Sequence, residues 1–508
     1  MILKDMSTTL YSRYLQTRIF FITALLGIAS FSVLKSQNTA EKLDTYFSAK
    51  ARHGDFNGVI LVAEKNNILY HKAFGFADFE HKRLNTLHSR FPIGSITKLL
   101  TATAVLQLVD QGLLNLEAPI RNYLSQFPYP DITLSHLLSH TSGLPGWDAV
   151  FKNTIQKHPD AVFTLDDILP EYTDQNIPLS FKPGSAHEYN NVNSVFVALL
   201  IEKASGEPYD IYMKQHIFAP AGMNDTFIPE IPFFNYTGSE KKNVSNLYID
   251  HMFSSIKENA ETISANKTYW KRFNFKGFGE IVLTAEDLFK FKKALTEGKL
   301  LSLSTLKKAQ TEVRLSDGSP SGIGLGWQIE EHNILGKLIG HGGGLPGLST
   351  GFIDQPDTQR VVIVFDNTQQ NAEDLEMEAL MILFGRKLPT PTKNIARIYG
   401  KSLLKSGSAI ATHELLSLQK DTTKYYLSEQ QMNRLGYDFL RSGKIPQAVE
   451  TFRMNTELFP QSSNTYDSYG ESLLKDSQKE KALIMYRKSV ELNPANENAK
   501  KIILELSR

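Results

Sequence analysis

The chain has 508 residues, which is too long for one compact core and favours roughly two to four structural units. Its 55 basic and 54 acidic residues leave almost no net charge, so no electrostatic field favours a nucleic acid partner. The absence of cysteine excludes disulfides, thiolate metal sites and a cysteine nucleophile.

The N-terminal residues 1–36 have the pattern of an export signal. Lys4, Arg13 and Arg18 precede an uncharged apolar run at residues 19–34. An uncleaved membrane anchor is the alternative, because this run falls just short of the roughly 20 residues that span a bilayer. Both interpretations predict an exported protein, either periplasmic or anchored with its bulk on the outer side of the membrane.

Residues 37–388 are predicted to form one α/β or α+β domain. Apolar, β-branched segments predict strands at 56–63 and 68–70, joined by a turn, and another at 361–365. Helical patterns fill the middle of this region, and a last helix is predicted at 373–384. Strands at both ends of a helical middle are typical of a mixed domain.

A second domain is predicted at residues 395–508, behind a linker at 389–394 in which two prolines favour an extended chain. Four positions recur with an offset of 34 residues, which is the tetratricopeptide period, and this predicts an all-α repeat domain. Clear repeats cover 429–462 and 463–496, and a degenerate first repeat fills the space before them. The recurring pairs are Gly436 and Gly470, Ala448 and Ala482, Phe452 and Tyr486, and Pro460 and Pro494.

The strongest candidate nucleophile is Ser95. The pattern Ser-x-x-Lys occurs nine times in the sequence, so the pattern alone carries no information. Ser95 differs because it begins a stretch, ending at Val109, that is apolar on nearly every face and therefore predicts a buried helix. A spacing of three places Lys98 on the same helix face, and the helix start offers free backbone N–H groups.

Lys98 must lose its proton before it can act as a base. Its pKa would have to fall from ~10.4 by roughly 3 units, or ~4 kcal/mol. Burial can supply a shift of this size, whereas a helix dipole contributes only ~0.3–1 kcal/mol. We therefore expect Lys98 to be buried.

Two rarer motifs follow Ser95 along the chain. Tyr189-Asn190-Asn191 is the single Tyr-x-Asn, and His341-Gly342-Gly343 is the single His-x-Gly. Their order resembles the three-motif active site of serine β-lactamases and penicillin-binding proteins, in which the third motif is Lys-Thr-Gly or a histidine variant. The class C β-lactamase and esterase branch fits best, because its second motif begins with tyrosine. The resemblance covers about residues 55–385.

The resemblance implies an antiparallel sheet flanked by a helical region, and chemistry without a metal or an organic cofactor. It makes Ser95 the acyl acceptor, with Lys98 and Tyr189 sharing the work of general base and acid. It therefore implies a serine hydrolase that acts on amide, ester or lactam bonds.

The same resemblance implies the substrate-binding residues. Asn191 would orient Lys98 and the substrate amide. The strand that carries His341 and Gly343 would hold the substrate, and the backbone N–H groups of Ser95 and Gly344 would form the oxyanion hole.

Three other patterns imitate functional motifs. Residues 347–351 match the Gly-x-Ser-x-Gly elbow of lipases, but a strand rather than a helix follows Ser349, so we expect a strand or loop residue. Lys405-Ser406-Gly407 imitates Lys-Thr-Gly, yet it lies at a predicted turn between repeat helices. His136 and His140 have a spacing that could bind a metal on a helix, but no third ligand is evident, which favours a structural role.

His341 bears on the substrate. A lysine in the third motif would be a permanent cation for a substrate carboxylate, whereas a histidine is charged only near or below its pKa of ~6.5. The sequence therefore favours a D-amino-acid or D-Ala-D-Ala-type peptidase, or an esterase, over the alternative of a β-lactamase.

A catalytically silent, penicillin-binding-like envelope protein is the alternative from another class. In either case we expect a small-molecule or peptide substrate or ligand and no nucleic acid. The repeats would contact a protein partner or the chain's own hydrolase domain.

Overall fold

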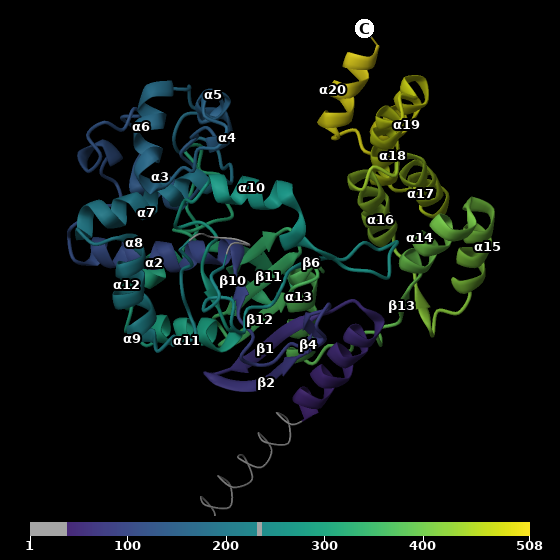
Figure 1. The fold of residues 1–508 in the computed structure, drawn as a ribbon, viewed down its shortest axis with the longest axis horizontal. Coiled ribbons are helices and arrows are strands. Elements are labelled where there is room, and N and C mark those ends of the chain that lie inside the picture. The colour runs from purple at the N-terminus through teal and green to yellow at the C-terminus, as the bar shows by residue number, and fades with distance from the viewer. Residues whose placement is uncertain (1–37, 231–235, 508) are drawn as a thin grey trace, which may run out of the picture.

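A computed structural model describes residues 38–230 and 236–507, so the predicted signal or anchor at residues 1–36 lies outside the described residues. A six-stranded sheet in the order β2-β1-β12-β11-β10-β9 forms its centre (Figure 1), and every neighbouring pair is antiparallel. The first strands of the chain thus pair with one of the last, which confirms the predicted antiparallel sheet. The strands are Gly58–Glu64 (β1), Asn67–Ala73 (β2), Gln328–His332 (β9), Gly336–Leu345 (β10), Leu348–Gln355 (β11) and Arg360–Asp366 (β12).

The two faces of the sheet belong to two cores. In β1, Val59 and Leu61 pack into the larger core with the central helices, whereas Ile60 and Val62 pack against residues 38–53 and α13 (Ala372–Leu383). This alternation follows from the two-residue period of a strand. It explains why β1 is apolar along its whole length, because helices cover both of its faces.

Helices and short strands surround this sheet within residues 38–230 and 236–388, which we call the sheet domain. Residues 38–53 form a helix that the sequence analysis did not predict. The predicted helix at 373–384 is confirmed as α13. The other elements are β3 (Phe76–Asp78), β4 (Arg83–Leu84), β5 (Phe91–Pro92), η1 (Gly94–Ile96), α2 (Thr97–Asp110), η2 (Ile120–Asn122), α3 (Leu134–Leu138), α4 (Trp147–Val150), α5 (Lys152–Lys157), α6 (Leu165–Gln175), α7 (Asn191–Ser205), α8 (Tyr209–Tyr212), η3 (Met213–Phe218), α9 (Ala219–Ala221), β6 (Tyr248–Ile249), β7 (Glu258–Asn259), η4 (Ala260–Thr262), α10 (Ser264–Arg272), β8 (Val282–Leu283), α11 (Ala285–Thr296), α12 (Leu303–Ala309) and α13 (Ala372–Leu383).

The C-terminal residues 395–507 form an all-α helical unit beside the sheet domain (Figure 1). Successive helices pair, and the predicted repeat positions meet inside the pairs: a Cβ on Gly436 would lie 2.5 Å from the Phe452 ring, and one on Gly470 would lie 3.0 Å from the Tyr486 ring. These contacts fit a 34-residue repeat, while the tetratricopeptide assignment stays a prediction. The elements are β13 (Lys393–Asn394), α14 (Ile395–Ser406), α15 (Ser408–Leu418), β14 (Tyr425–Tyr426), α16 (Glu429–Arg441), α17 (Ile445–Leu458), α18 (Ser463–Lys475), α19 (Lys479–Leu492) and α20 (Glu497–Leu506).

No helix within residues 38–230 and 236–507 is both long and apolar enough to cross a membrane. The helix predicted from Ser95 begins slightly later than expected. Ser95 lies in the 3₁₀ turn η1, and α2 continues from Thr97 with nearly every side chain buried. The nucleophile candidate therefore lies at the N-terminal entrance of a central helix.

Candidate active site

Ser95 is held between the start of α2 and strand β10. Gly94 has φ +53°, and a Cβ on Gly94 would lie 2.9 Å from the backbone nitrogen of Gly344. Only glycine combines this left-handed conformation with so close an approach. The turn before α2 thus brings Ser95 against the third-motif strand, as the sequence analysis expected.

Three side chains of the first two motifs meet at one atom. The Lys98 ammonium donates to Ser95 Oγ at 2.9 Å, and the Tyr189 hydroxyl donates to the same oxygen at 2.7 Å. Ser95 and Lys98 come from one helix entrance, while Tyr189 precedes α7, so tertiary packing brings together residues that are 94 positions apart. The structure therefore assembles the predicted trio at hydrogen-bond distance.

Lys98 lies in a buried and nearly uncharged environment. Its side chain is 3% exposed, and its second hydrogen bond goes to the carbonyl oxygen of Phe278 at 2.7 Å. Burial lowers the pKa of Lys98 to about 7, and the carboxylate of Glu280 opposes this shift. A large share of Lys98 is consequently neutral at physiological pH, which is the state that a general base requires.

Phe278 and Glu280 are site residues that the sequence analysis missed. The buried carboxylate of Glu280 accepts the backbone N–H groups of Gly277 at 2.7 Å, Phe278 at 3.2 Å and Gly279 at 3.0 Å. These bonds fold the segment into a tight turn that aims the Phe278 carbonyl at Lys98. The Gly-Phe-Gly-Glu pattern signals such a turn, but it gives no indication of the lysine that the turn would face.

Tyr189 is fixed from behind by histidine and asparagine side chains. The ring of His140 packs against the Tyr189 ring at 4.6 Å, and His140 Nδ1 accepts from Asn190 N at 3.3 Å and from Asn193 Nδ2 at 3.0 Å. Burial raises the pKa of Tyr189 to about 12, although its hydrogen bond to Ser95 works in the opposite direction. Tyr189 is thus a phenol at neutral pH and can donate a proton.

Asn191 was expected to orient both Lys98 and the substrate amide. No hydrogen bond joins Asn191 to Lys98 within the described parts of the chain, and its contact with the substrate amide stays a prediction. Asn191 instead begins α7, and its Oδ1 is buried without a hydrogen-bond partner in the same residues. The carbonyl of Phe278 makes the orienting contact to Lys98.

His341 is a neutral imidazole in this site. It is 4% exposed, and its Nδ1–H donates to the carbonyl of Gly342 at 2.6 Å, while Nε2 is buried without a partner among the described residues. Burial, followed by the positive charge of nearby Lys98, lowers the pKa of His341 to about 3. The ordinary histidine pKa assumed from the sequence is therefore wrong for this residue, which provides no cation near pH 6.5.

The third-motif strand offers a free edge. Strand β9 pairs only with Gly336–Gly340, so the β10 segment His341–Leu345 has no strand partner on that side within the described residues. A Cβ on Gly343 would lie 2.1 Å from the carbonyl oxygen of Ile93, which requires glycine there. A Cβ on Gly344 would lie 3.9 Å from the carbonyl oxygen of Leu348, so it would meet no clash. The free edge can pair with an extended substrate backbone.

A cavity opens at each end of this free edge. The Tyr189 cavity, of about 450 Å³, is lined by Tyr189 and His341 among others. The Gly344 cavity, of about 830 Å³, extends from Gly344 to the helical unit. We call the free edge and its two cavities the substrate groove.

The three imitating patterns supply no hydrogen bond to Ser95 within the described residues, although the ring of His140 supports Tyr189. Ser349 is in β11, and its hydroxyl accepts from Ala372 N at 3.0 Å, which confirms the expected strand position. Lys405 lies at the end of α14, directly before the turn into α15. His136 completes the capping box of α3 with Thr133. His136 and His140 both have structural roles, as expected.

Comparison with known proteins identifies the relatives of this chain. Residues 43–385 match the sequence profile described as Beta-lactamase. The chain is 30% identical over 390 residues to "Penicillin-binding protein 4*" of Bacillus subtilis (strain 168), covering 73% of this chain and 85% of that protein. It is 34% identical over 217 residues to "Esterase EstB" of Burkholderia gladioli, covering 40% of this chain and 54% of that protein. A penicillin-binding protein structure from Bacillus halodurans superposes with a TM-score of 0.55 at 27% identity, covering 67% of this chain and 99% of that one.

Proposed function

The chain belongs to the beta-lactamase family of serine hydrolases, and from this premise we propose that it hydrolyses ester or amide bonds through an acyl-enzyme at Ser95. One observation carries the proposal: Lys98 Nζ and Tyr189 Oη both lie within hydrogen-bond distance of Ser95 Oγ. Such a pair can remove a proton from the nucleophile and deliver one to the leaving group.

Acylation begins when neutral Lys98 accepts the hydroxyl proton of Ser95. The Oγ then bonds to the substrate carbonyl carbon, and the backbone N–H groups of Ser95 and Gly344 stabilise the negative carbonyl oxygen. Tyr189 donates its phenolic proton to the leaving oxygen or nitrogen as the scissile bond breaks, and the protonated Lys98 restores the proton to Tyr189. Water then attacks the Ser95 ester, with the same groups acting in reverse.

The leaving group enters the Tyr189 cavity, because Tyr189 must reach the leaving atom. The described lining of this cavity contains no lysine or arginine but three glutamates, Glu330, Glu373 and Glu376. Burial raises the pKa of Glu376 well above its usual range, and His341 is neutral. A leaving group with a carboxylate therefore finds no cation, which favours esters and D-amino-acid amides over β-lactams.

Covalent labelling tests the proposal. The full chain is treated with a fluorescent fluorophosphonate and a fluorescent penicillin, alongside Ser95→Ala. We expect fluorophosphonate labelling that disappears in Ser95→Ala, with slow or weak penicillin labelling. Labelling that survives in Ser95→Ala would contradict the assignment of the nucleophile. Rapid penicillin turnover would favour the β-lactamase alternative, and the absence of any Ser95-dependent label would favour the silent envelope protein.

We also propose that the chain is exported. The supporting observation is the basic and apolar pattern before residue 36, which lies outside the described residues. Cell fractionation with N-terminal sequencing of the mature protein tests this, and a cytoplasmic, full-length product would contradict it.

A further inference from the structure

The Gly344 cavity is shared between the two parts of the chain. On one side its lining includes the β10–β11 turn at Gly344 and Pro346, together with Phe253. On the other side it includes Arg441 and Lys444, from the turn between α16 and α17 of the helical unit. The same residue, Gly344, thus belongs to the oxyanion-hole strand and to a cavity whose outer wall the helical unit supplies.

Carboxylates in the cavity wall are already paired. Asp250 binds Lys257 at 2.6 Å and Arg397 at 2.7 Å. His251 bridges the other two acids, with Nδ1 at 2.8 Å from Asp438 and Nε2 at 3.1 Å from Glu258. Hydrogen bonding to Asp438 is the largest influence that raises the pKa of His251, so both carboxylates of this cluster share one hydrogen-bonded partner.

The arginine and lysine side chains of the same wall form no ion pair within residues 38–230 and 236–507. Arg434 donates to the neutral oxygens of Gln370 at 3.0 Å and Gln369 at 3.0 Å. Arg441 and Lys444 make no ion pair with any carboxylate in the part of the chain that the structure describes, and Lys444 Nζ lies 5.9 Å from the centre of the Phe253 ring. The cavity wall therefore presents three cationic side chains that no carboxylate pairs with among the described residues.

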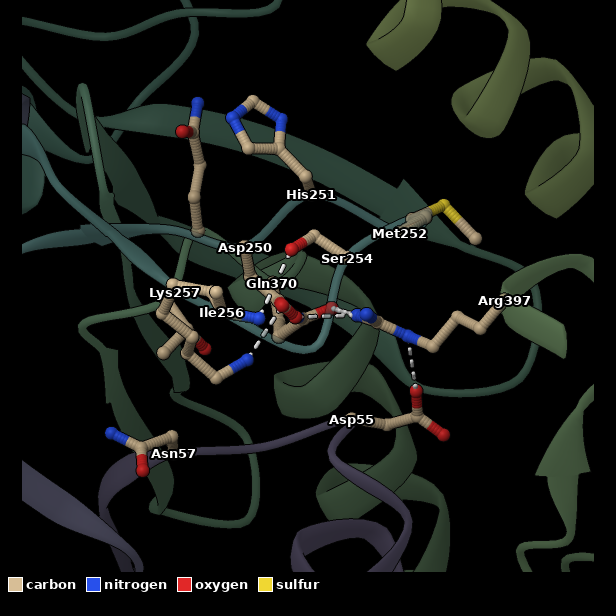
Figure 2. A network of polar contacts seen from close by, with 12 residues as sticks. Asp55, Asn57, Asp250, His251, Met252, Ser254, Ile256, Lys257, Gln370 and Arg397 are labelled. Atoms are coloured by element: carbon tan, nitrogen blue, oxygen red, sulfur yellow. Dashed lines mark hydrogen bonds and ion pairs between the residues drawn. The ribbon is translucent and has the colours of Figure 1, made fainter. Parts of the chain in front are cut away.

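The helical unit is fixed firmly enough to hold these cations in place. Asp438 accepts the backbone N–H of Met252 at 2.7 Å, and the rings of Phe253 and Phe439 stack at 4.6 Å. Figure 2 shows the second anchor, in which Arg397 of α14 reaches Asp250 at 2.7 Å and Asp55 at 3.5 Å. A buried pair of this kind fixes one arrangement, because separating its charges is costly.

The position of the cations relative to the scissile bond follows from the proposed function. Tyr189 protonates the leaving group, so the leaving group occupies the Tyr189 cavity. The Gly344 cavity lies at the opposite end of the free edge and receives the acyl side of the substrate. A group bonded to the acyl side, and extended along β10 past Gly344, therefore arrives beside Arg441 and Lys444.

We propose that the helical unit completes the substrate groove, and that Arg441 and Lys444 bind a carboxylate on the acyl side of the scissile bond. This inference rests on the proposed acyl-enzyme at Ser95. It assigns the substrate class as acidic acyl donors, such as peptides or amino acids that carry a free carboxylate away from the bond that is cut. Two flexible cations on a turn can bind such a group without a rigid bidentate geometry.

Isosteric substrates test the proposal in the full chain. N-succinyl-D-alanine and N-succinamoyl-D-alanine p-nitrophenyl esters differ only in a terminal carboxylate or carboxamide. We expect kcat/KM to favour the succinyl ester by about 10-fold, mainly through KM, which is the scale of two partly exposed ion pairs. High salt should reduce the preference, because it screens exposed charges.

Charge-removing variants locate the effect. Arg441→Gln and Lys444→Gln should each lower the ratio of kcat/KM for the succinyl ester to that for the succinamoyl ester by about threefold, and the double variant should bring this ratio to about one. Lys475→Gln is the matched control, because Lys475 occupies the position 34 residues after Arg441, is exposed, and lies outside the cavity lining. A preference that the double variant retains would overturn the inference.

A binding measurement separates this inference from the proposed function. N-succinyl-D-alaninamide and N-succinamoyl-D-alaninamide are titrated into full-length Ser95→Ala. Tighter binding of the succinyl compound that depends on Arg441 and Lys444 supports the subsite even if no ester is turned over. Equal binding of the two compounds overturns the subsite even where hydrolysis at Ser95 is intact.

Discussion

The two ends of the substrate groove differ in charge. We call the part around Ser95 the neutral end and the part at Gly344 the charged end. Around Ser95 the basic groups are neutral or nearly so, because burial lowers the pKa of Lys98 to about 7 and that of His341 to about 3. At the Gly344 end, Arg441 and Lys444 face the cavity without acidic partners among the described residues. The difference indicates that the two parts of the chain have different roles. The sheet domain provides the buried groups that transfer protons, and the helical unit provides the cations that bind a charged substrate group.

The largest effect should come from Lys98→Met at the neutral end. Loss of the general base should slow acylation by about 10³-fold, the middle of the range for proton transfer by a positioned side chain. The rate of fluorophosphonate labelling measures this, with circular dichroism to confirm folding. Lys292→Met is the matched control, because Lys292 is also buried but lies 3.8 Å from Asp354, away from Ser95. Equal rates in the two variants would contradict the assigned base.

The charged end should lose its preference for a substrate carboxylate when the Arg397 anchor of the helical unit is removed. Arg397→Met leaves Asp55 without its ion pair and Asp250 with Lys257 alone, which should destabilise the docking of the helical unit by about 3–5 kcal/mol. We expect the preference for the succinyl ester to fall about 10-fold towards unity while the succinamoyl ester is still hydrolysed. Arg453→Met, in a half-exposed ion pair within α17, serves as the control and should cost about 1 kcal/mol or less. An unchanged preference in Arg397→Met would mean that docking does not position the cations.

His341→Lys should add a positive charge to the neutral end of the substrate groove. While it is protonated, a lysine at this position places a positive charge beside the Tyr189 cavity and should raise kcat/KM by about fivefold for substrates whose leaving group carries a carboxylate. A leaving group with a carboxamide in place of that carboxylate controls for the general effect of the substitution. Equal responses of the two substrates would show that the neutral third motif does not determine the choice of leaving group.

The dependence of kcat/KM on pH measures the protonation of Lys98. Because Lys98 acts as a base only when it is unprotonated, kcat/KM should rise with pH and level off above an inflection near 7. The charge of Glu280 raises the pKa of Lys98, so Glu280→Gln should move this inflection to lower pH by a fraction of a unit. An inflection that does not move, or that moves to higher pH, would contradict the assignment to Lys98.

Ser349→Ala should have the smallest effect. Its hydroxyl only accepts the backbone N–H of Ala372, so we expect labelling at Ser95 to change by less than about twofold and stability to fall by about 1 kcal/mol. Thermal unfolding and labelling of the same sample measure both. A large loss of labelling would favour Ser349 over Ser95 as the nucleophile.

Motifs along the sequence predicted the residues of the neutral end but not all of their contacts. Ser95, Lys98 and Tyr189 could be predicted because local spacing and rare motifs identify them. The contact from Phe278 could not, because it uses a backbone carbonyl 180 positions from Lys98, which no side-chain pattern encodes. The pKa of His341 depends on burial and on the charge of Lys98, and neither can be deduced from His-Gly-Gly alone.

The residues of the charged end could not be predicted from the sequence. The 34-residue offset predicts helical hairpins, and it treats Arg441 and Lys475 as equivalent positions. The docking contacts of Asp438, Phe439 and Arg397 distinguish them, since these contacts place the hairpin of α16 and α17, and not that of α18 and α19, beside Gly344. Repeat patterns determine how helices pair, whereas the surface on which a repeat docks depends on contacts between distant parts of the chain.

The central claim is that Ser95 carries the acyl group, and mass spectrometry of the trapped intermediate tests it most directly. The full chain is mixed with N-succinyl-D-alanine p-nitrophenyl ester, quenched in acid within the first turnover, digested and sequenced by fragmentation. The account predicts one N-succinyl-D-alanyl adduct, on the peptide that contains Ser95, and none in Ser95→Ala. An adduct on another serine, or hydrolysis by Ser95→Ala at the native rate, would contradict it.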